Sequence, residues 1–429
     1  MISLIIIVLL FALLAAGVPV GFAMGVCGAI GLYEVAGWDA LVGVLQTSPL
    51  STVSSYELIT IPMFLLMAEF VLISGIADDL FGAAAAWIGH IRGGLGMATA
   101  LAGAAFGAIC GTSTASAATL SSTSLPAMLK QGYEPRMAAG VVAISGTLAM
   151  LIPPSVALVV FGLLADVNIG KLLIGGVIPG ALVTLTIMLT VYLLAVRDPT
   201  RAPLSPRILF ADKIRLLKVV GPMIILIMLV TGVIYTGIAT PTEASALGSF
   251  GAFLIVIWRC GLKSRTHVRI ALTRAAQGTC MIAMILLGAS LFGYFFTLTH
   301  VTQNIITWIG SLDTSRWIII IVLLAGYIVL GAFMDQIAIL VLTVPIVIPI
   351  IRSLGFDPIW FGVIKIVTAE VGMITPPIGL NCFIVARYAN RPVTEVFWGV
   401  WPHFIAHLIV IGILVAFPDL ILWLPSKMR

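Results

Sequence analysis

Apolar stretches long enough to cross a membrane recur along the whole chain, separated by short polar breaks. A spanning helix needs about 20 apolar residues to cross roughly 30 Å of hydrocarbon. The pattern predicts five crossings in the first half and five in the second: 2–16, 18–34, 57–76, 136–165, 170–196, 219–239, 241–258, 275–300, 359–389 and 396–423. We therefore expect an all-α polytopic membrane protein.

Two further apolar stretches do not fit a single straight span. Residues 95–129 carry the polar run GTSTAS near their centre, and residues 316–352 form a matching stretch. We interpret both as re-entrant helical hairpins, because non-helical backbone at membrane depth is tolerated only where protein or a cavity surrounds it. The segments 81–92 and 303–313 are shorter and polar at one end, so we expect amphipathic arms near the interface.

Prolines and glycines recur at a constant offset, which indicates an internal repeat. Gly132 and Gly355 lie 223 positions apart. The same offset relates Pro135 to Pro358, Met150 to Met373, Pro153 and Pro154 to Pro376 and Pro377, Gly176 to Gly399, and Pro179 to Pro402. Because the first half has an odd number of crossings, the second half must run inverted. Each repeat thus contains a re-entrant hairpin and a discontinuous helix, the arrangement typical of ion-coupled transporters.

This repeat divides the chain into segments with different expected roles. They are the scaffold helices of repeat 1 (1–56), the third span with its arm (57–92), the first half of a transport core (93–165), a closing span (166–196), a basic loop (197–218), the scaffold helices of repeat 2 with a second basic loop (219–274), a span with its arm (275–315), the second half of the core (316–390) and a C-terminal span (391–429).

Composition and charge agree with a membrane location. Hydrophobic residues make up 61% of the chain and charged residues only 9%, so most segments have no polar face for water. Cations gather in two clusters, one over 197–218 and one over 259–274 that includes Lys263. The positive-inside rule places both clusters in the cytoplasm, and ten crossings then place both termini outside. Lys427 and Arg429 at the C-terminus would be external cations, which does not agree with the rule. Two short basic loops beside spans do not indicate nucleic-acid binding, and the five cysteines lack paired spacing for disulfides or a metal.

The first hairpin carries an unusual density of hydroxyl groups. Nine of the thirteen residues at 112–124 are Ser or Thr. Sodium is a hard cation that takes oxygen ligands, so this run favours an ion or substrate site. The alternative is that small residues let helices pack closely, but Ala and Gly would satisfy that need alone.

Each discontinuous helix contains a double proline, in SGTLAMLIPPS (145–155) and AEVGMITPPIGLN (369–381). Two prolines remove two ladder hydrogen bonds and leave carbonyl oxygens free. The alternative is an ordinary kink whose carbonyls are satisfied by a neighbouring Ser or by water. Two breaks related by the repeat, each flanked by Thr or Ser, favour a binding role.

Ionisable residues inside apolar segments are expensive, about 2.5–3.5 kcal/mol each at mid-bilayer even on lenient scales, and are therefore functional or paired. Asp335 follows Gly331 at the second expected tip and is assigned to the site. Lys365 either pairs with Glu370 or extends toward the interface, and for Glu69 helix packing or an interface contact is preferred.

Other polar residues receive structural interpretations. Glu243 follows Thr240 and Pro241 at the spacing of a helix capping box. His300, His403 and His407 are interpreted as packed or interfacial side chains, which are commoner than histidine ligands at such positions.

Four stretches resemble the large membrane subunit of tripartite ATP-independent periplasmic (TRAP) transporters: FGAICGTSTASAATLSSTSLPAMLKQGY, SGTLAMLIPPS, ATPTEASALG, and GAFMDQIAILVLTVPIVIPI followed by EVGMITPPIGLN. With their spacing they cover most of the chain. The family often has PEM where this chain has PAM at Pro126 to Met128, which leaves the local charge pairing open but not the fold.

The resemblance implies an elevator-type, sodium-coupled uptake system of the bacterial inner membrane. It would work with a separate small four-helix membrane subunit and a periplasmic protein that captures an organic acid, such as a dicarboxylate or sugar acid. No cofactor beyond the coupling sodium is expected, and no catalytic residue. A stand-alone sodium- or proton-coupled carrier of related fold is the first alternative, and a membrane enzyme or channel is the second.

The motifs of the resemblance and the residue types together select the expected binding residues. They are Gly111, Thr112, Ser113, Thr114 and Ser116 at the first tip, Ser145, Gly146, Thr147, Pro153 and Pro154 at the first break, Gly331 and Asp335 at the second tip, and Thr368, Glu370, Gly372, Thr375, Pro376, Pro377 and Asn381 at the second break. The expected sodium ligands among them are Thr112, Ser113, Ser145, Thr147, Gly331, Asp335, Thr368, Gly372 and Thr375.

Overall fold

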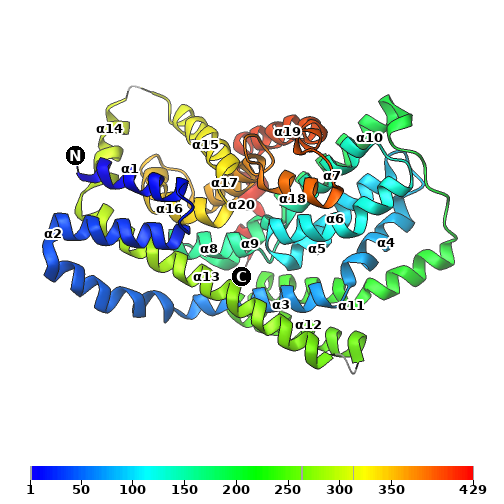
Figure 1. The fold of residues 1–429 in the computed structure, drawn as a ribbon, viewed down its shortest axis with the longest axis horizontal. Coiled ribbons are helices and arrows are strands. Elements are labelled where there is room, and N and C mark those ends of the chain that lie inside the picture. The colour runs from blue at the N-terminus through cyan, green and yellow to red at the C-terminus, as the bar shows by residue number, and fades with distance from the viewer. Residues whose placement is uncertain (1, 262–263, 313, 429) are drawn as a thin grey trace.

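A computed structural model describes residues 2–261, 264–312 and 314–428 of the chain (Figure 1), and all regular structure within these ranges is helical. Lys263 of the second basic cluster, residue 313 of the second arm, and Arg429 at the C-terminus lie outside the described residues. Nine of the described helical segments are long and apolar enough to cross a membrane. The all-α, multi-pass class expected from the sequence is confirmed.

One group of helices forms the scaffold: α1 (Ile2–Ala15), α2 (Val20–Val53), α3 (Thr60–Ile73), α11 (Phe210–Tyr235), α12 (Pro241–Cys260) and α13 (Ser264–Leu298). In Figure 1 most of them lie along the lower side of the molecule, where α13 packs along α2 and α12 packs on α3. The α2–α13 contact depends on glycine, since a Cβ atom built on Gly288 would lie 2.1 Å from the carbonyl oxygen of Gly21.

The hydropathy pattern placed several helix ends wrongly. The span expected to end at residue 34 continues to Val53 as α2, through a bend at Gly37 whose φ is +81°. Helix α13 begins at Ser264, so the second basic segment is mostly helix, and α11 likewise includes the end of the first. Helical hydrogen bonding continues past the apolar residues into the polar headgroup level, where charged side chains are solvated.

The expected arms are also helices, shifted toward the N-terminus. They are α4 (Ile76–Ile88) and α14 (Val301–Ser311), where 81–92 and 303–313 were expected. Each follows a residue with positive φ, Gly75 and His300 respectively, which turns the chain sharply out of the preceding helix.

Both expected hairpins are present, as α5 (Gly94–Cys110) with α6 (Ser113–Lys130), and α15 (Arg316–Phe333) with α16 (Gln336–Ser353). Both discontinuous helices are present too, as α7 (Pro135–Thr147), η2 (Leu148–Met150) and α8 (Val156–Ala165), and as α17 (Pro358–Gly372) with α18 (Leu380–Ala389). Figure 1 shows α5 and α6 on the right of the view and α15 and α16 on the left, with α8 and α17 between them.

The two halves share local geometry at the positions that the 223-residue offset relates. Gly132 and Gly355 both have positive φ, +88° and +77°, and end the two hairpins. Three residues later, Pro135 and Pro358 begin α7 and α17. Proline at the first helical position costs no hydrogen bond. The two glycines therefore end a helix, and the two prolines begin one, at matching positions in each half.

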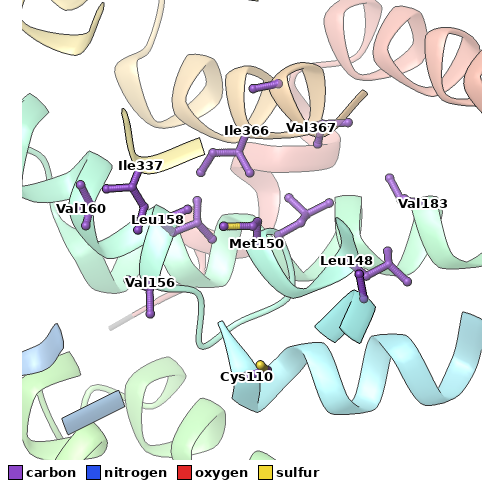
Figure 2. Packing of buried hydrophobic residues seen from close by; sticks show 14 of the residues in the cluster. Cys110, Leu148, Met150, Val156, Leu158, Val160, Val183, Ile337, Ile366 and Val367 are labelled. Atoms are coloured by element: carbon purple, nitrogen blue, oxygen red, sulfur yellow. The ribbon is translucent and has the colours of Figure 1, made fainter. Parts of the chain in front are cut away.

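The broken helix of each half also packs against the hairpin of the other half. Helix α8 packs against α16, and α18 packs against α6, so each broken helix touches the hairpin of the other half. Figure 2 shows Leu158 and Val160 of α8 beside Ile337 of α16, with Ile366 of α17 close by. All four side chains are buried, which makes this the dry centre of the molecule.

The short helix η1 (Tyr56–Ile59) packs on α3 and α12. The remaining helices support this core: α9 (Ile169–Gly175), α10 (Val177–Arg197), η3 (Pro199–Arg201), α19 (Val393–Ala416) and α20 (Asp419–Ser426). Helix α10 packs against α5 and α19, and α19 packs against α7. The α7–α19 contact is again a glycine contact, because a Cβ atom on Gly399 would lie 1.9 Å from the Arg136 carbonyl oxygen. Such close backbones make α10 and α19 part of the same packed unit as α5 and α7.

Candidate functional site

The first hairpin tip rests against the first break. Gly111 ends α5 with φ +63°, and a Cβ atom there would lie 2.9 Å from a methyl carbon of Val156 and 3.3 Å from its amide nitrogen. A glycine is required at this position both by its backbone conformation and by the close approach of the break. The tip residues 111–116 are therefore held at the start of α8.

The second tip rests against the second break in a corresponding way. A Cβ atom on Gly331 would lie 2.8 Å from the Cα atom of Gly372. The carbonyl oxygen of Ala332 accepts hydrogen bonds from the amides of Ile378 at 3.2 Å and Gly379 at 3.3 Å. Gly331 lies inside helix α15, so the non-helical part of this tip is shorter than expected and comprises Met334 and Asp335.

Two contacts connect the halves across the site. The hydroxyl of Ser113, at the first tip, donates to the sulfur of Met373 in the second break at 3.7 Å. The side-chain amide of Asn381 donates to the carbonyl oxygen of Ala143 in α7 at 3.4 Å. The structure thus brings the first tip, α7 and the second break together.

Most of the expected binding residues are buried, although Pro376 and Pro377 are exposed. Side chains with no exposed surface are Ser113, Ser116, Ser145, Thr147, Thr368, Glu370 and Asn381. Three threonine hydroxyls donate hydrogen bonds to backbone carbonyl oxygens of their own helices. Thr147 donates to Ile144 at 2.8 Å, Thr368 to Ile364 at 2.8 Å and Thr375 to Val371 at 2.6 Å. A hydroxyl that donates this way keeps its lone pairs for a cation.

Several buried polar atoms in the same region have no hydrogen-bond partner among the described residues. They are the hydroxyl oxygens of Ser116 and Ser145, both carboxylate oxygens of Glu370, and the amide oxygen of Asn381. Burying such a group unpaired costs about 1–3 kcal/mol, and more when it is charged. All four residues were expected in the site from the sequence.

The hydroxyl run of α6 divides into two parts. Away from the tip, Ser121 and Ser124 bond the carbonyl oxygens four residues earlier, at 2.6 and 2.9 Å, and Ser122 bonds Thr119 at 2.8 Å. These hydroxyls serve helix packing, the alternative considered for the whole run. At the tip end, Ser113 contacts Met373 of the second break and the Ser116 hydroxyl is unpaired; farther along α6, the Thr123 hydroxyl is also buried without a partner among the described residues.

The breaks use some of the carbonyl oxygens that the double prolines were expected to free. Ser155 donates to the Met150 oxygen and accepts from the amide of Leu158 at 3.2 Å. The Met373 oxygen accepts from the amide of Asn381 at 3.3 Å. The peptide bonds Pro153–Pro154 and Pro376–Pro377 are both cis. A side chain at the first break and a backbone amide at the second thus satisfy part of each break.

Lys365 differs from both of its expected roles. Its side chain is fully buried, so it does not extend to the interface, and no ion pair joins it to Glu370 in the described part of the chain. Its ammonium lies 5.1 Å from the ring centre of Tyr327 and interacts electrostatically with Asp335. The five-residue spacing from Glu370 places the two side chains on different faces of α17, which explains the error.

The other charged residues have clear structural positions. Asp335 accepts from the amide of Ile337 at 3.0 Å and caps α16. Glu69 lies 3.8 Å from Arg274 of α13, an ion pair that replaces the packing or interface contact preferred for it. The capping box of Thr240 and Glu243 is confirmed, with the Thr240 amide 2.8 Å from the carboxylate.

The histidines behave as packed side chains on α19 or as part of a turn. His403 and His407 are buried on one face of α19, while His300 has positive φ and precedes α14. Packing rather than ligation was expected for all three.

Gln336 is a candidate that the sequence reasoning missed. It begins α16 directly after Asp335, its side chain has no exposed surface, and neither amide atom has a hydrogen-bond partner among the described residues. The signal was available, because an amide at the first residue of an otherwise apolar helix, QIAIL, is an unusual choice.

A cavity of about 800 Å³ lies away from the tips. Its lining comes from the scaffold segments 51–58, 240–242 and 286–293 and from 162–170 and Pro345 of the core. Hydroxyl, amide and carboxylate side chains line much of it, so it is a wettable gap between the two groups of helices.

A multi-pass helical bundle in which two hairpins and two broken helices hold buried, unpartnered polar groups is the architecture of a membrane transport protein. Comparison with known proteins makes this specific. The chain belongs to the DctM component family of the tripartite ATP-independent periplasmic transporters, whose family model matches residues 7–420.

Named relatives agree with this family. The chain is 34% identical to the C4-dicarboxylate TRAP transporter large permease protein DctM of Pseudomonas aeruginosa, over 87% of each chain. It is 28% identical to the sialic acid TRAP transporter large permease protein SiaM of Vibrio cholerae, over 96% of each. It is 29% identical to the ectoine/5-hydroxyectoine large permease protein UehC of Ruegeria pomeroyi, over 97% of this chain and 96% of that one.

A solved structure has the same fold. The Alcanivorax borkumensis YdaH transporter matches with a TM-score of 0.63 over 90% of each chain, at 14% sequence identity. At that identity the match supports the fold alone.

Proposed function

We propose that the chain is the membrane permease of a sodium-coupled uptake system for an organic acid anion. Three relatives are named for C4-dicarboxylates, sialic acid and ectoine, which carry a carboxylate, and another is named for isethionate, which carries a sulfonate. The shared chemistry supports a substrate with an organic acid group, most often a carboxylate. We place the system in the bacterial inner membrane, where a small membrane subunit and a periplasmic binding protein are the other two components of the tripartite transporter.

The observation that carries the proposal is the set of buried, unpartnered oxygens at the first tip and the two breaks. Ser116, Ser145, Glu370 and Asn381 all contribute such oxygens, and each is fully buried. Oxygen ligands suit a hard cation such as sodium. A bound ion or substrate would satisfy groups that otherwise oppose folding.

Sodium also explains how an anion reaches the middle of the membrane. Moving a lone charge there costs several kcal/mol, and a cation beside it removes much of that cost. The N-termini of α6 and α8, which begin beside the first tip, add positive potential. Each sodium ion that moves inward across 100 mV releases about 2.3 kcal/mol, and uptake is electrogenic when the sodium charges outnumber the negative charges on the substrate.

The transport step in this proposal is an elevator movement of the core relative to the scaffold. The hairpins and broken helices are bound to one another by close backbone contacts, such as the one between Gly331 and Gly372. The polar cavity separates part of this unit from the scaffold. Both features support a core that moves as one body.

Sodium binding can be tested on the purified chain without substrate or partners. Sodium should raise the thermal unfolding midpoint, while potassium at equal ionic strength should not. Ser145→Ala removes an unpartnered oxygen, so it should raise the half-saturating sodium concentration ten- to a hundredfold, as expected for a contact to a charge worth about 1.5–3 kcal/mol.

The matched control is Ser124→Ala, because Ser124 lies about three helical turns from the tip in α6, where its hydroxyl bonds the Leu120 carbonyl at 2.9 Å. It should leave sodium affinity unchanged. Equal stabilisation by sodium and potassium, or equal effects of the two substitutions, would remove sodium coupling from the proposal.

A further inference from the structure

A groove lies between the beginning of α11 and the end of α12. It has a volume of about 340 Å³ and is lined by Arg215, Lys218, Val219, Trp258 and Arg259. Three of these five side chains are cationic and none is acidic. The groove therefore attracts an anion.

Only one of the three cations is neutralised within the described part of the chain. Arg259 forms an ion pair with Asp79 of α4, with 2.5 Å between nitrogen and oxygen. Arg215 and Lys218 belong to none of the ion pairs found among the described residues. Within the described part of the chain, these two charges therefore have no close ion pair.

Aromatic side chains mark the depth of this groove in the membrane. Trp258, at the edge of the groove, has 70% of its surface exposed. Nearby on α11, Lys213 lies 5.6 Å from the ring centre of Trp87, which packs edge-on against Phe210. Exposed tryptophans and cations at helix ends are typical of the headgroup level.

Farther along α11 and α12 from the groove, the two helices present an exposed apolar surface. Ile225 lies two turns beyond Lys218 and is 65% exposed, and Leu254 lies one turn before Trp258 and is 49% exposed. Met228 and Phe250 extend this surface, with 70% and 60% exposure. A ligand of the groove would therefore have an anionic head beside an apolar tail.

We propose that the groove binds an anionic phospholipid of the cytoplasmic leaflet. Arg215 and Lys218 contact the headgroup phosphate, Trp258 lies at the glycerol level, and the acyl chains follow Ile225 and Leu254. A free phosphate ion would use the cations but not the apolar surface. The bound lipid fixes the depth of the α11–α12 pair in the membrane.

The test uses the delipidated full chain in detergent and native mass spectrometry. Dioleoyl phosphatidylglycerol should bind more tightly than dioleoyl phosphatidylcholine. The double variant Arg215→Gln/Lys218→Gln should weaken phosphatidylglycerol binding about thirtyfold, at the strength typical of basic residues near a membrane surface. Arg259 is left intact because its removal would leave Asp79 without its partner.

The control variant is Arg207→Gln/Arg265→Gln, which removes the same charge from two exposed residues outside the groove. It should change phosphatidylglycerol affinity less than twofold. The charge-conserving variant Arg215→Lys/Lys218→Arg should keep the affinity, which separates loss of the site from loss of folding. Equal binding of the two lipids, equal losses in both charge-removing variants, or displacement of the lipid by millimolar inorganic phosphate would overturn the proposal.

Discussion

At the scale of single residues, the closest backbone contact at the second tip is between Gly331 and Gly372. A Cβ atom on Gly331 would lie 2.6 Å from the Ala369 carbonyl oxygen, where neither backbone can move away easily. Gly331→Ala should therefore reduce the free energy of unfolding by about 1–3 kcal/mol, the usual cost of overpacking. The thermal unfolding midpoint in detergent measures this.

Gly326→Ala is the matched control, because Gly326 lies on the same helix and a Cβ atom there would meet no atom within 4 Å. It should be neutral or slightly stabilising, since alanine favours helix. Equal midpoints for the two variants would mean that tip and break are not in contact.

Residue-level reasoning anticipated burial at the expected site. Glu370 was singled out because an ionisable group in an apolar helix needs a reason, and Ser145 and Asn381 because they lie in the breaks and the family motif; all three are buried and hold an unpaired side-chain oxygen, and their part in binding stays a prediction. The method failed where a partner is distant in sequence. Lys365 lies over Tyr327, which is 38 positions earlier, and no local pattern encodes that contact.

At the scale of helices, the first break depends on one side chain. The Ser155 hydroxyl bonds the Met150 carbonyl and caps α8 through the amide of Leu158. Ser155→Ala removes the cap and leaves a buried carbonyl unpaired, so we expect a loss of about 1–3 kcal/mol in unfolding free energy. Sodium stabilisation should weaken too, because the break positions its neighbours.

Ser353→Ala provides the comparison, since that hydroxyl only bonds the Ile350 carbonyl of its own helix at 2.8 Å. Its unfolding midpoint should match the parent within error. A harmless Ser155→Ala would show that the prolines hold the break without the hydroxyl.

Helix existence was predictable and helix ends were not. Double prolines and hydroxyl runs marked the breaks and tips, because they disturb a regular apolar helix. The same hydropathy could not show that α2 reaches Val53 or that α13 begins at Ser264. Polar residues at those ends are compatible with either helix or loop, so hydropathy does not decide where the helix stops.

At the scale of the molecule, two packed units face each other. Helices α10 and α19 pack on the hairpin and broken helices, and α2 packs on α13 and α12 on α3, while α3 also contacts α5 and α8 and α13 contacts α16. The 223-residue offset was visible in the sequence because glycine and proline have fixed geometric functions. The sequence did not show that each broken helix packs on the hairpin of the other half, because an apolar surface can pack against many others of similar shape.

If the core slides, a covalent bond between the two units must stop uptake. Gly170 of α9 faces Ile234 of α11: a Cβ atom on Gly170 would lie 3.6 Å from the Cγ2 methyl carbon of Ile234, so this pair is a candidate for an engineered disulfide. Oxidised Gly170→Cys/Ile234→Cys, with Cys260 and Cys280 replaced by serine, should lose substrate uptake in proteoliposomes containing the whole transport system, and a reductant should restore it. Ser48→Cys/Ser290→Cys joins α2 to α13 within the scaffold, where the two hydroxyls lie 2.6 Å apart, and should transport normally when oxidised. Full uptake through the oxidised core-to-scaffold variant would rule out a sliding core.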